Sequence, residues 1–259
     1  IVGTRVLMKS VGVTTGYIGI ENNKHDAIER VAERLKERAD RADDAGRPVF
    51  PEGTIQVQPL TVKYPQGGEK QLIQAILGRE VPSGKLPLDV GCVVSNVGTT
   101  VAVYRAVQKK MPFIERVVTV TGKELSQGRN FLVRLGTPVS ALVEAVGGVP
   151  EGTGKIVMGG PMTGKSLISF ETPVTKGSGG LIFIPQDEAV RNRVENCIRC
   201  SRCVQSCPMG LEPYLLEKLV DHSKWDLADS EAIMDCIECG SCSFACPSNR
   251  PLLDYIRIG

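Results

Sequence analysis

The sequence predicts an α/β fold in three domains, and three observations predict it. Apolar strand-like runs alternate with amphipathic helical segments over residues 1–111. A stretch rich in β-branched residues and glycine follows over residues 112–185. Eight of the nine cysteines then fall in two runs within residues 186–259. The chain therefore divides into an α/β domain, a small β-rich domain and a helical, cysteine-rich domain.

The bulk composition is that of an ordinary globular protein. The 259 residues are enough for about two domains as a first estimate, and 42% of them are hydrophobic. A net charge of +2 gives no electrostatic case for binding nucleic acid. No run approaches the roughly 18 apolar residues that a membrane span needs. The first residues, Ile1–Arg5, include no initiator methionine and no signal peptide, so we expect a fragment that begins inside its first domain.

The first domain begins with a strand–helix–strand pattern. Arg5–Val11 has the pattern of a helix end, with Gly12 as the stop. Tyr17–Glu21 is a short apolar strand. The predicted elements that follow are a charged amphipathic helix, His25–Ala45, ended by Gly46 and Pro48, and a strand, Ile55–Pro59. This order is typical of a βαβ unit with a parallel sheet.

A glycine pair comes before the next predicted helix, Gln71–Gly78. Backbone amides at Gly67 and Gly68 would allow a phosphate or the edge of a ring to approach closely. The alternative is that the pair only forms a turn, as many glycine pairs do. Both readings stay open from the residues alone.

The end of the first domain is predicted as a buried strand, Leu88–Val94, followed by a helix through Val107. Cys92, in the middle of the strand, is expected to be a small buried hydrophobe and not a ligand. Asn96 and Thr99 stand at the start of the helix. They either cap it or face a ligand, and the sequence does not decide between the two.

The second domain alternates short strands with one helix. Two strands, a helix and a third strand in this order predict a β-grasp module. The elements are Arg116–Thr121, Asn130–Arg134, a helix Val139–Val146 that starts from Thr137-Pro138 and stops at Gly147-Gly148, and Lys155–Met158.

One motif in this domain imitates a nucleotide site. Gly159–Ser166 fits the P-loop pattern G-x4-G-K-[ST]. A P-loop needs a following helix to aim its amides at phosphate. Here the chain after Ser166 has an extended pattern and soon meets Pro173. We therefore predict a turn and no nucleotide binding at this motif.

The two cysteine runs both fit the pattern C-x2-C-x2-C-x3-C-P of bacterial two-cluster ferredoxins. In those proteins the fourth cysteine of each run serves the cluster of the other run. We predict two [4Fe–4S] clusters with this exchange. The first cluster takes Cys197, Cys200, Cys203 and Cys246, and the second takes Cys236, Cys239, Cys242 and Cys207.

Disulfides and structural zinc are the alternatives for these cysteines. Disulfides are typical of small secreted chains, and nothing else here indicates secretion. Zinc sites commonly use two C-x2-C pairs set further apart and do not need two full runs that each end in proline. Thiolates that hold clusters also favour a reducing compartment.

Short helices are predicted around the cysteine runs. They bring the two loops side by side, and one of them has a stripe of leucine and valine for core packing. His25, His222 and Trp225 are expected to be surface or packing residues, because eight thiolates already satisfy two clusters. The predicted segments are Asp187–Arg193, Glu212–Val220 with the stripe Leu215, Leu216, Leu219 and Val220, Leu227–Asp235, and Pro251–Arg257.

Several segments resemble the C subunit of the Rnf electron-transport complex, a family related to the flavin-bearing, NADH-oxidising subunit of respiratory complex I. The resemblance continues through both cysteine runs to Tyr255–Arg257. It implies a partial Rossmann-like flavin and NADH domain, a soluble-ligand-binding β-grasp domain and a ferredoxin-type domain. The segments that carry it are Glu21–Lys24, Lys63–Ile73, Arg79–Gly84 and Asn96–Thr99.

The resemblance also implies cofactors, with FMN in the first domain and NADH as the hydride donor. Lys24 and Lys70 would balance phosphate charge. The family's glycine-rich flavin loop is not in this sequence, and we expect it upstream. By matching position, the residues that face the flavin are Glu21, Asn22, Asn23, Gly67, Gly68, Glu69, Asn96 and Thr99.

The predicted function is electron transfer between NADH, FMN and the two clusters, in a membrane-bound complex that couples ferredoxin and NAD to ion translocation. The partners implied are the other subunits of that complex and a ferredoxin or flavoprotein subunit. The location implied is peripheral, on the cytoplasmic face of the membrane. The alternatives are a related corrin reductase of propanediol metabolism and a flavin-free electron-transfer subunit.

Overall fold

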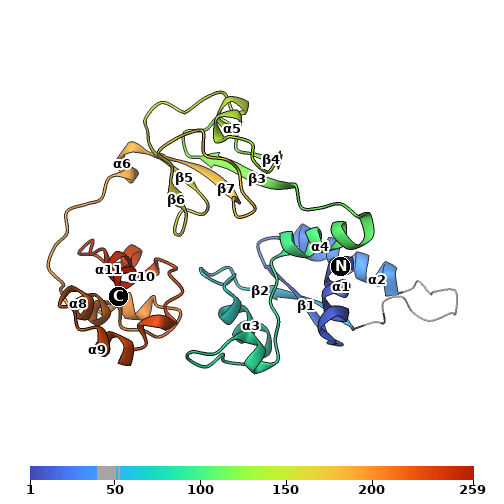
Figure 1. Cartoon of the computed structure of the whole chain (residues 1–259), viewed down its shortest axis with the longest axis horizontal. Helices are drawn as coiled ribbons and strands as arrows, with labels where there is room; N and C mark the ends of the chain where they lie inside the picture. The colour runs from blue at the N-terminus through green and yellow to red at the C-terminus, as the bar shows by residue number, and fades with distance from the viewer. Residues whose placement is uncertain (40–50, 52) are drawn as a thin grey trace. The chain divides into compact units, whose positions relative to one another are not determined.

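The structure, a computed structural model, describes residues 1–39, 51 and 53–259 (Figure 1). The chain forms two compact units, Ile1–Phe113 and Ile114–Gly259. The first unit carries a small parallel sheet with helices. The second carries a five-stranded sheet and, after it, the cysteine-rich helices.

The first unit contains the predicted strand–helix–strand pattern. Strands β1 (Gly16–Glu21) and β2 (Ile55–Leu60) pair in parallel, with Gly16 opposite Ile55 and Glu21 opposite Leu60. Helix α2 (His25–Ala39) connects them, and the predicted helix residues 40–45 with their stop at Gly46 and Pro48 lie outside the described residues. Helix α1 (Val2–Val11) ends at Gly12, whose φ of 73° suits a residue without a Cβ.

Two further helices complete this unit, α3 (Glu69–Leu77) and α4 (Val97–Lys109). Helix α3 begins two residues before the predicted start. Ile73 of α3 packs with Val81 and Cys92 in a small apolar cluster. Cys92 is 8% exposed, which confirms its prediction as a buried residue.

The predicted strand Leu88–Val94 is wrong. Pro87–Val90 forms a 3-10 turn, η1, in which the Asp89 carboxylate accepts a hydrogen bond from the Leu86 amide at 2.8 Å. Gly91 then reverses the chain with φ of 69°. Leu88 and Val93 are 68% and 55% exposed. A proline and a side-chain cap satisfied this backbone locally, so the apolar run did not need a sheet.

The five-stranded sheet of the second unit has the order β4-β3-β7-β5-β6. Strand β3 pairs antiparallel with β4 and parallel with β7, and β5 pairs antiparallel with both β7 and β6. The sequence prediction missed β7, although it is the central strand. The bounds are β3 (Glu115–Gly122), β4 (Arg129–Arg134), helix α5 (Val139–Ala145), β5 (Thr153–Met158), β6 (Lys165–Ser166) and β7 (Gly180–Pro185).

The two strands, the helix and the third strand predicted here are confirmed to within two residues. The predicted start of the helix was wrong by one position. Pro138 is itself the N-cap residue of α5, and no side chain caps the helix. The P-loop imitation leads into strand β6 and not into a helix, so the turn predicted there is confirmed.

The core of this sheet is made by side chains from β3, β7 and α5. Val118, Val120, Val139 and Leu181 are each 0% exposed, and Phe183 is 2% exposed. Burial of these groups is the main force that holds the sheet against the helix.

Leu181→Ala should destabilise this unit by about 2–4 kcal/mol, because it removes buried methyl groups and leaves a cavity in the central strand. Urea unfolding followed by circular dichroism measures the change. Leu132→Ala, on β4 where the side chain is 60% exposed, is the matched control and should change little. Equal losses for the two variants would contradict the packing described.

The cysteine-rich helices are short. Two predictions for this region needed correction: the helix Asp187–Arg193 ends at Ala189, and Leu227–Asp235 is interrupted at Ala232, whose φ is 56°. The elements are α6 (Gln186–Ala189), α7 (Arg202–Gln205), α8 (Pro213–Asp221), α9 (Trp225–Ser230), η2 (Ile233–Asp235), α10 (Ser241–Ala245) and α11 (Leu252–Ile258).

Helix α8 packs against α11, and its buried face differs from the predicted stripe. Leu216 and Val220 are buried, but Leu215 and Leu219 are only partly so, and Glu217 takes a buried place. His222 and Trp225 are exposed.

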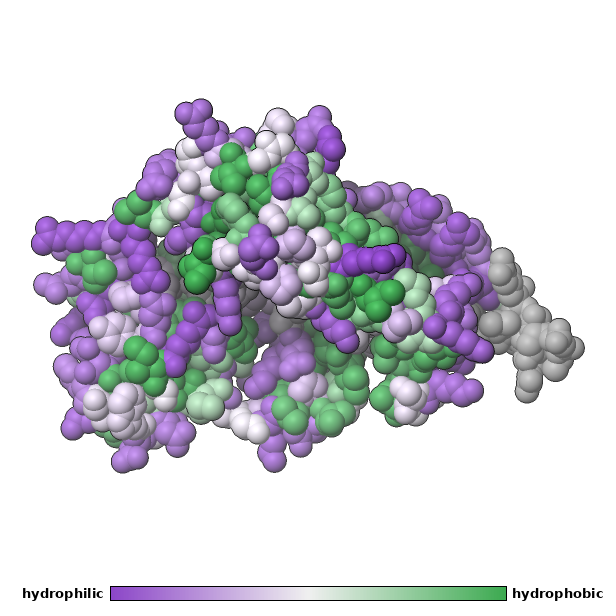
Figure 2. Space-filling view, turned by 45° about the horizontal axis from the view of Figure 1, so that its top comes forward, coloured by the Kyte–Doolittle hydropathy of each residue, from purple (hydrophilic) through white to green (hydrophobic). Residues whose placement is uncertain are grey.

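The surface drawn in Figure 2 interleaves hydrophilic side chains with small hydrophobic patches. Within the described ranges, every helix is too short or too polar to span a bilayer.

Candidate functional site

The two cysteine loops repeat the same local backbone. Arg199 and Ser201 in the first loop have φ of 56° and 59°, and the residues in register, Glu238 and Gly240, have 52° and 80°. The third cysteine of each run then lies in the first turns of a short helix, α7 or α10. Left-handed residues are uncommon outside glycine, so their recurrence in register marks one loop structure used twice.

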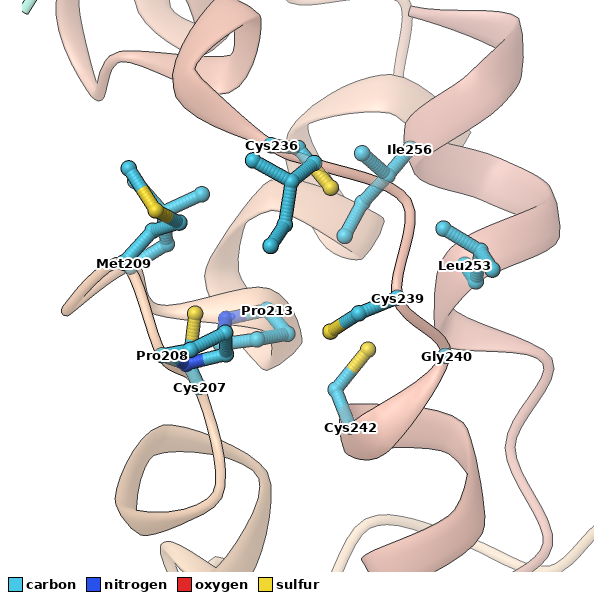
Figure 3. Close-up of a pocket in the computed structure, with 12 residues that line it drawn as sticks. Cys207, Pro208, Met209, Pro213, Cys236, Cys239, Gly240, Cys242, Leu253 and Ile256 are labelled. Carbon is cyan, nitrogen blue, oxygen red and sulfur yellow. The ribbon is translucent and has the colours of Figure 1, made fainter. Parts of the chain in front are cut away.

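The second set of predicted ligands lines one pocket. Cys207 comes from the first run, and Cys236, Cys239 and Cys242 come from the second. Figure 3 shows the sulfur atoms of Cys239 and Cys242 directed into the space that Cys207 also borders. The rest of the lining is largely apolar: Pro208, Met209, Leu211, Pro213, Ile237, Gly240, Leu253 and Ile256.

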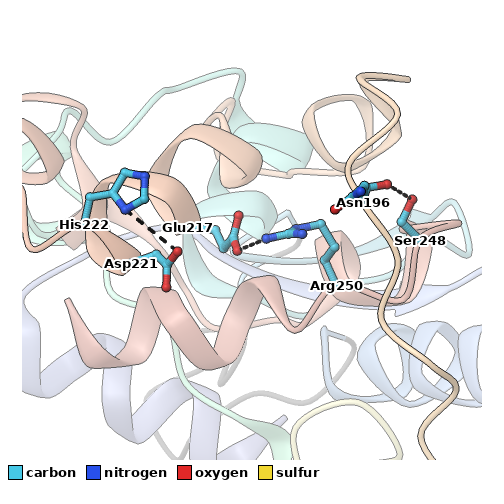
Figure 4. Close-up of polar contacts among 6 residues, drawn as sticks. All are labelled: Asn196, Glu217, Asp221, His222, Ser248 and Arg250. Atoms are coloured by element: carbon cyan, nitrogen blue, oxygen red, sulfur yellow. Dashed lines mark hydrogen bonds and ion pairs between the residues drawn. The ribbon is translucent and has the colours of Figure 1, made fainter.

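The first set is brought together by a segment that crosses the module. The Ser248 hydroxyl donates to the Asn196 carbonyl at 2.9 Å (Figure 4), and the Glu195 amide donates to the Ser248 carbonyl at 2.9 Å. These bonds fix the residue before Cys197 beside the residue two after Cys246. Cys246 also packs against the buried Cys203. Cys200 is exposed on the same loop.

The burial of three thiols changes their acidity. Desolvation raises the pKa of Cys203 and Cys236, and it raises the pKa of Cys242 to about 11. Without a metal these thiols are protonated at neutral pH. Because metal ligation needs thiolates, binding at this site must release protons.

The cysteine pocket does not have the geometry of a single-ion site. Among the described residues, no three His, Cys, Asp or Glu side chains converge closely enough to hold one metal ion. In a cubane each thiolate binds a different iron, so its four sulfurs stand farther apart than around one zinc ion. The donor set, four thiols in apolar surroundings, is that of an iron–sulfur cluster.

Sequence reasoning missed a buried ion pair beside these loops. Arg250 Nη2 donates to Glu217 Oε1 (Figure 4), and the Glu217 side chain is 2% exposed. The pair joins helix α8 to the segment after the last cysteine. A signal was present, because Glu217 stands with Leu216 and Val220 at helical spacing on the face that packs inward.

The residues predicted to face a flavin lie at three places in the first unit. Glu21, at the end of β1, is followed by a turn in which the Lys24 amide donates to the Glu21 carbonyl at 3.0 Å. Gly68 is the N-cap of α3. Since β1 and β2 are parallel, the segments after both strands leave the same edge of the sheet. The structure therefore brings Glu21–Asn23 and the β2–α3 connection to one edge.

Asn96 has a structural role in this unit. Its Oδ1 atom accepts a hydrogen bond from the Gly98 amide at 2.8 Å, which caps helix α4. Thr99 lies in the first turn of that helix and is exposed. Of the two readings left open by the sequence, capping is therefore present for Asn96.

Gly67 has no conformational reason to be glycine. A Cβ built there would meet nothing within 4 Å, and its φ is not in the left-handed region. At Gly68, by contrast, a Cβ would come within 2.3 Å of the Gln71 side chain. An exposed backbone with open space over it is what close approach of a ligand requires.

Comparison with known families divides the chain into three matches. Residues 1–105 match the family described as Nuo51 FMN-binding domain. Residues 117–166 match the SLBB domain, and residues 196–250 match the 4Fe-4S dicluster domain. The last match includes all eight cysteines of the two runs.

Known relatives are similar along nearly the whole chain, and each is the C subunit of a membrane complex's namesake family. The C subunit of the proton-translocating ferredoxin:NAD(+) oxidoreductase complex of Clostridium ljungdahlii is 40% identical over 259 residues, which are 99% of this chain and 53% of the relative. The C subunit of the Na(+)-translocating ferredoxin:NAD(+) oxidoreductase complex of Acetobacterium woodii is 39% identical over 258 residues, 100% of this chain and 55% of the relative. The C subunit of the ion-translocating oxidoreductase complex of Yersinia enterocolitica is 38% identical over 258 residues, 99% and 35%. The chain spans about half the length of the first two relatives.

Proposed function

Because this chain is homologous along nearly all of its length to the C subunit of ion-translocating ferredoxin:NAD(+) oxidoreductase complexes, we propose that it transfers electrons between NADH and two [4Fe–4S] clusters through FMN. The activity would be that of an oxidoreductase subunit within an ion-translocating complex. Its partners would be the other subunits of that complex and a ferredoxin or flavoprotein subunit. The chain would be peripheral, on the cytoplasmic face of the membrane.

The cysteine geometry is the observation that carries the proposal. One pocket is lined by three cysteines of the second run and by Cys207 of the first. That arrangement supports the exchange of the fourth ligand between runs. The first cluster would take Cys197, Cys200, Cys203 and Cys246, and the second would take Cys236, Cys239, Cys242 and Cys207.

The domain assignment follows from the same homology. The parallel β1–α2–β2 unit supports a partial Rossmann-like flavin and NADH domain over residues 1–111. The mixed sheet with α5 supports a β-grasp module over residues 112–185. The ferredoxin-type domain would occupy residues 186–259.

In this function the first unit would bind FMN and NADH. FMN, when bound, accepts a hydride and releases electrons one at a time, which clusters need. The residues that would hold it are Glu21, Asn22, Asn23, Gly67, Gly68, Glu69, Asn96 and Thr99. Amides at Gly67 and Gly68 would donate to the ligand, and the buried thiolates would keep the clusters in low-dielectric surroundings.

A cofactor inventory of the anaerobically purified chain tests the proposal. We expect about eight iron atoms and about eight acid-labile sulfides per chain. We also expect FMN to bind and NADH to reduce a dye when FMN is supplied. Two clusters without flavin binding or dye reduction would point to a flavin-free electron-transfer subunit. Zinc in place of iron, or sulfurs bonded to each other, would overturn the proposal.

Gly67→Ala should weaken FMN binding by about tenfold and leave the unfolding free energy unchanged, because the added methyl group meets no protein atom but occupies the space over the amide. Fluorescence titration with FMN and urea unfolding measure the two effects. Gly84→Ala, in a turn where a Cβ also meets nothing but φ is 67°, is the control that lowers stability without changing FMN affinity. Unchanged affinity in Gly67→Ala would remove this residue from the site.

A further inference from the structure

The two cysteine runs differ at one position in register. Four residues after the last cysteine, the first run has Leu211 and the second has Arg250. Leu211 is 8% exposed and lines the pocket of the second cysteine set. The repeat thus places an aliphatic side chain at one set of thiols and a guanidinium at the corresponding place beside the other.

Arg250 is held in place by the buried Glu217. The guanidinium side chain is only 21% exposed, and its Nε atom is buried without a hydrogen-bond partner among the described residues. Such an orphaned donor is rare in folded proteins and calls for an acceptor. A buried ion pair adds little stability over an apolar pair of similar size, so stability alone does not explain it.

The thiols nearest this guanidinium in electrostatic effect belong to the first set. The hydrogen bond to Glu217 is the main cause that raises the pKa of Arg250, and the charges of Glu217, Cys197 and Cys246 add to it. Cys197 and Cys246 are brought together by the Ser248–Asn196 bond described above. Arg250 therefore stands beside two thiols that come from different runs.

We propose that Arg250 is a positioning residue that donates an N–H to a sulfur of the cluster held by Cys197, Cys200, Cys203 and Cys246, and so raises the reduction potential of that cluster above that of the other. The proposal rests on the proposed function. A reduced cluster carries one more negative charge, so a nearby cation and donor stabilise it.

The loop charges act in the same direction. In register, the first loop has Arg199 and Arg202 where the second has Glu238 and Ser241. Glu238 is paired with Arg257 at 2.7 Å, which limits its effect. The first cluster is then the favoured resting place of an electron, and transfer from the second cluster to the first is downhill.

Potentials of the single clusters provide the test. Cys239→Ser in the full chain leaves only the first cluster, and Cys200→Ser leaves only the second. In each background we would compare native Arg250, Arg250→Lys, and the paired variant Glu217→Leu with Arg250→Leu, which avoids an unpaired buried carboxylate. Each anaerobic sample is titrated with redox mediators and followed by electron paramagnetic resonance, with iron and sulfide measured alongside.

The expected result is a lower potential of the first cluster in the paired variant, a smaller shift in Arg250→Lys, and no shift of the second cluster. Arg191→Leu, which removes an exposed cation at 76% exposure, is the charge control and should shift neither. An unchanged first cluster, or equal shifts of both, would overturn the role of Arg250 while two clusters remain. Absence of iron–sulfur clusters in the parent chain would overturn the proposed function instead.

Discussion

Cys246→Ser is expected to reduce the iron content from about eight to about four atoms per chain, through loss of the cluster that belongs to the other run. The reason is that Cys246 lies beside Cys203 and is fixed next to Cys197 by the Ser248–Asn196 bond. Serine is a poor ligand for iron in this site, because soft thiolates are what these clusters need. Iron and sulfide analysis of anaerobic protein measures the loss.

Double variants separate the two possible pairings. If the fourth ligands are exchanged, Cys200→Ser with Cys246→Ser touches one cluster and keeps about four iron atoms. Cys239→Ser with Cys246→Ser then removes a ligand from each cluster and loses nearly all the iron. The opposite pattern would show that each run holds its own cluster. Cys92→Ser, at a buried cysteine outside the runs, is the control that should keep both clusters.

Arg250→Leu is expected to destabilise the cysteine-rich part of the chain by about 3–5 kcal/mol, because it leaves the buried Glu217 carboxylate without its partner. Glu217→Gln should cost less, since the Arg250 side chain is 21% exposed and can reach water. Urea unfolding followed by the fluorescence of Trp225, the only tryptophan of the chain, measures both.

The matched control is the paired replacement of Glu217 and Arg250 by leucine. Apolar pairs of similar volume often replace buried ion pairs with little loss, so this variant should recover most of the stability. If the paired variant were as unstable as Arg250→Leu, packing and not an unpaired charge would explain the effect.

The parts of this protein that sequence predicts well are those set by local spacing. The β1–α2–β2 order, the end of α1 at Gly12 and the two cysteine loops all follow from periodicity and motif. The strand Leu88–Val94 failed because an apolar run has no fixed period, and a proline with an Asp89 cap decided the backbone locally.

Long-range partners are what the sequence did not show. Strand β7 became central only because β3 and β5 pair with it from distant parts of the chain. The Glu217–Arg250 pair joins residues 33 positions apart, and neither residue belongs to a ligand motif. Such contacts depend on tertiary packing, which propensity and spacing do not encode.

The bonds between residues 195–196 and Ser248 bear on biosynthesis. With exchanged ligands, neither cube can close around its fourth iron from one run alone. A ribosome must therefore have made the chain as far as Cys246 before the first inorganic core is fully enclosed. Insertion of iron and sulfide should accordingly be post-translational, on a nearly finished module, and a chain interrupted between the two runs should receive neither core intact.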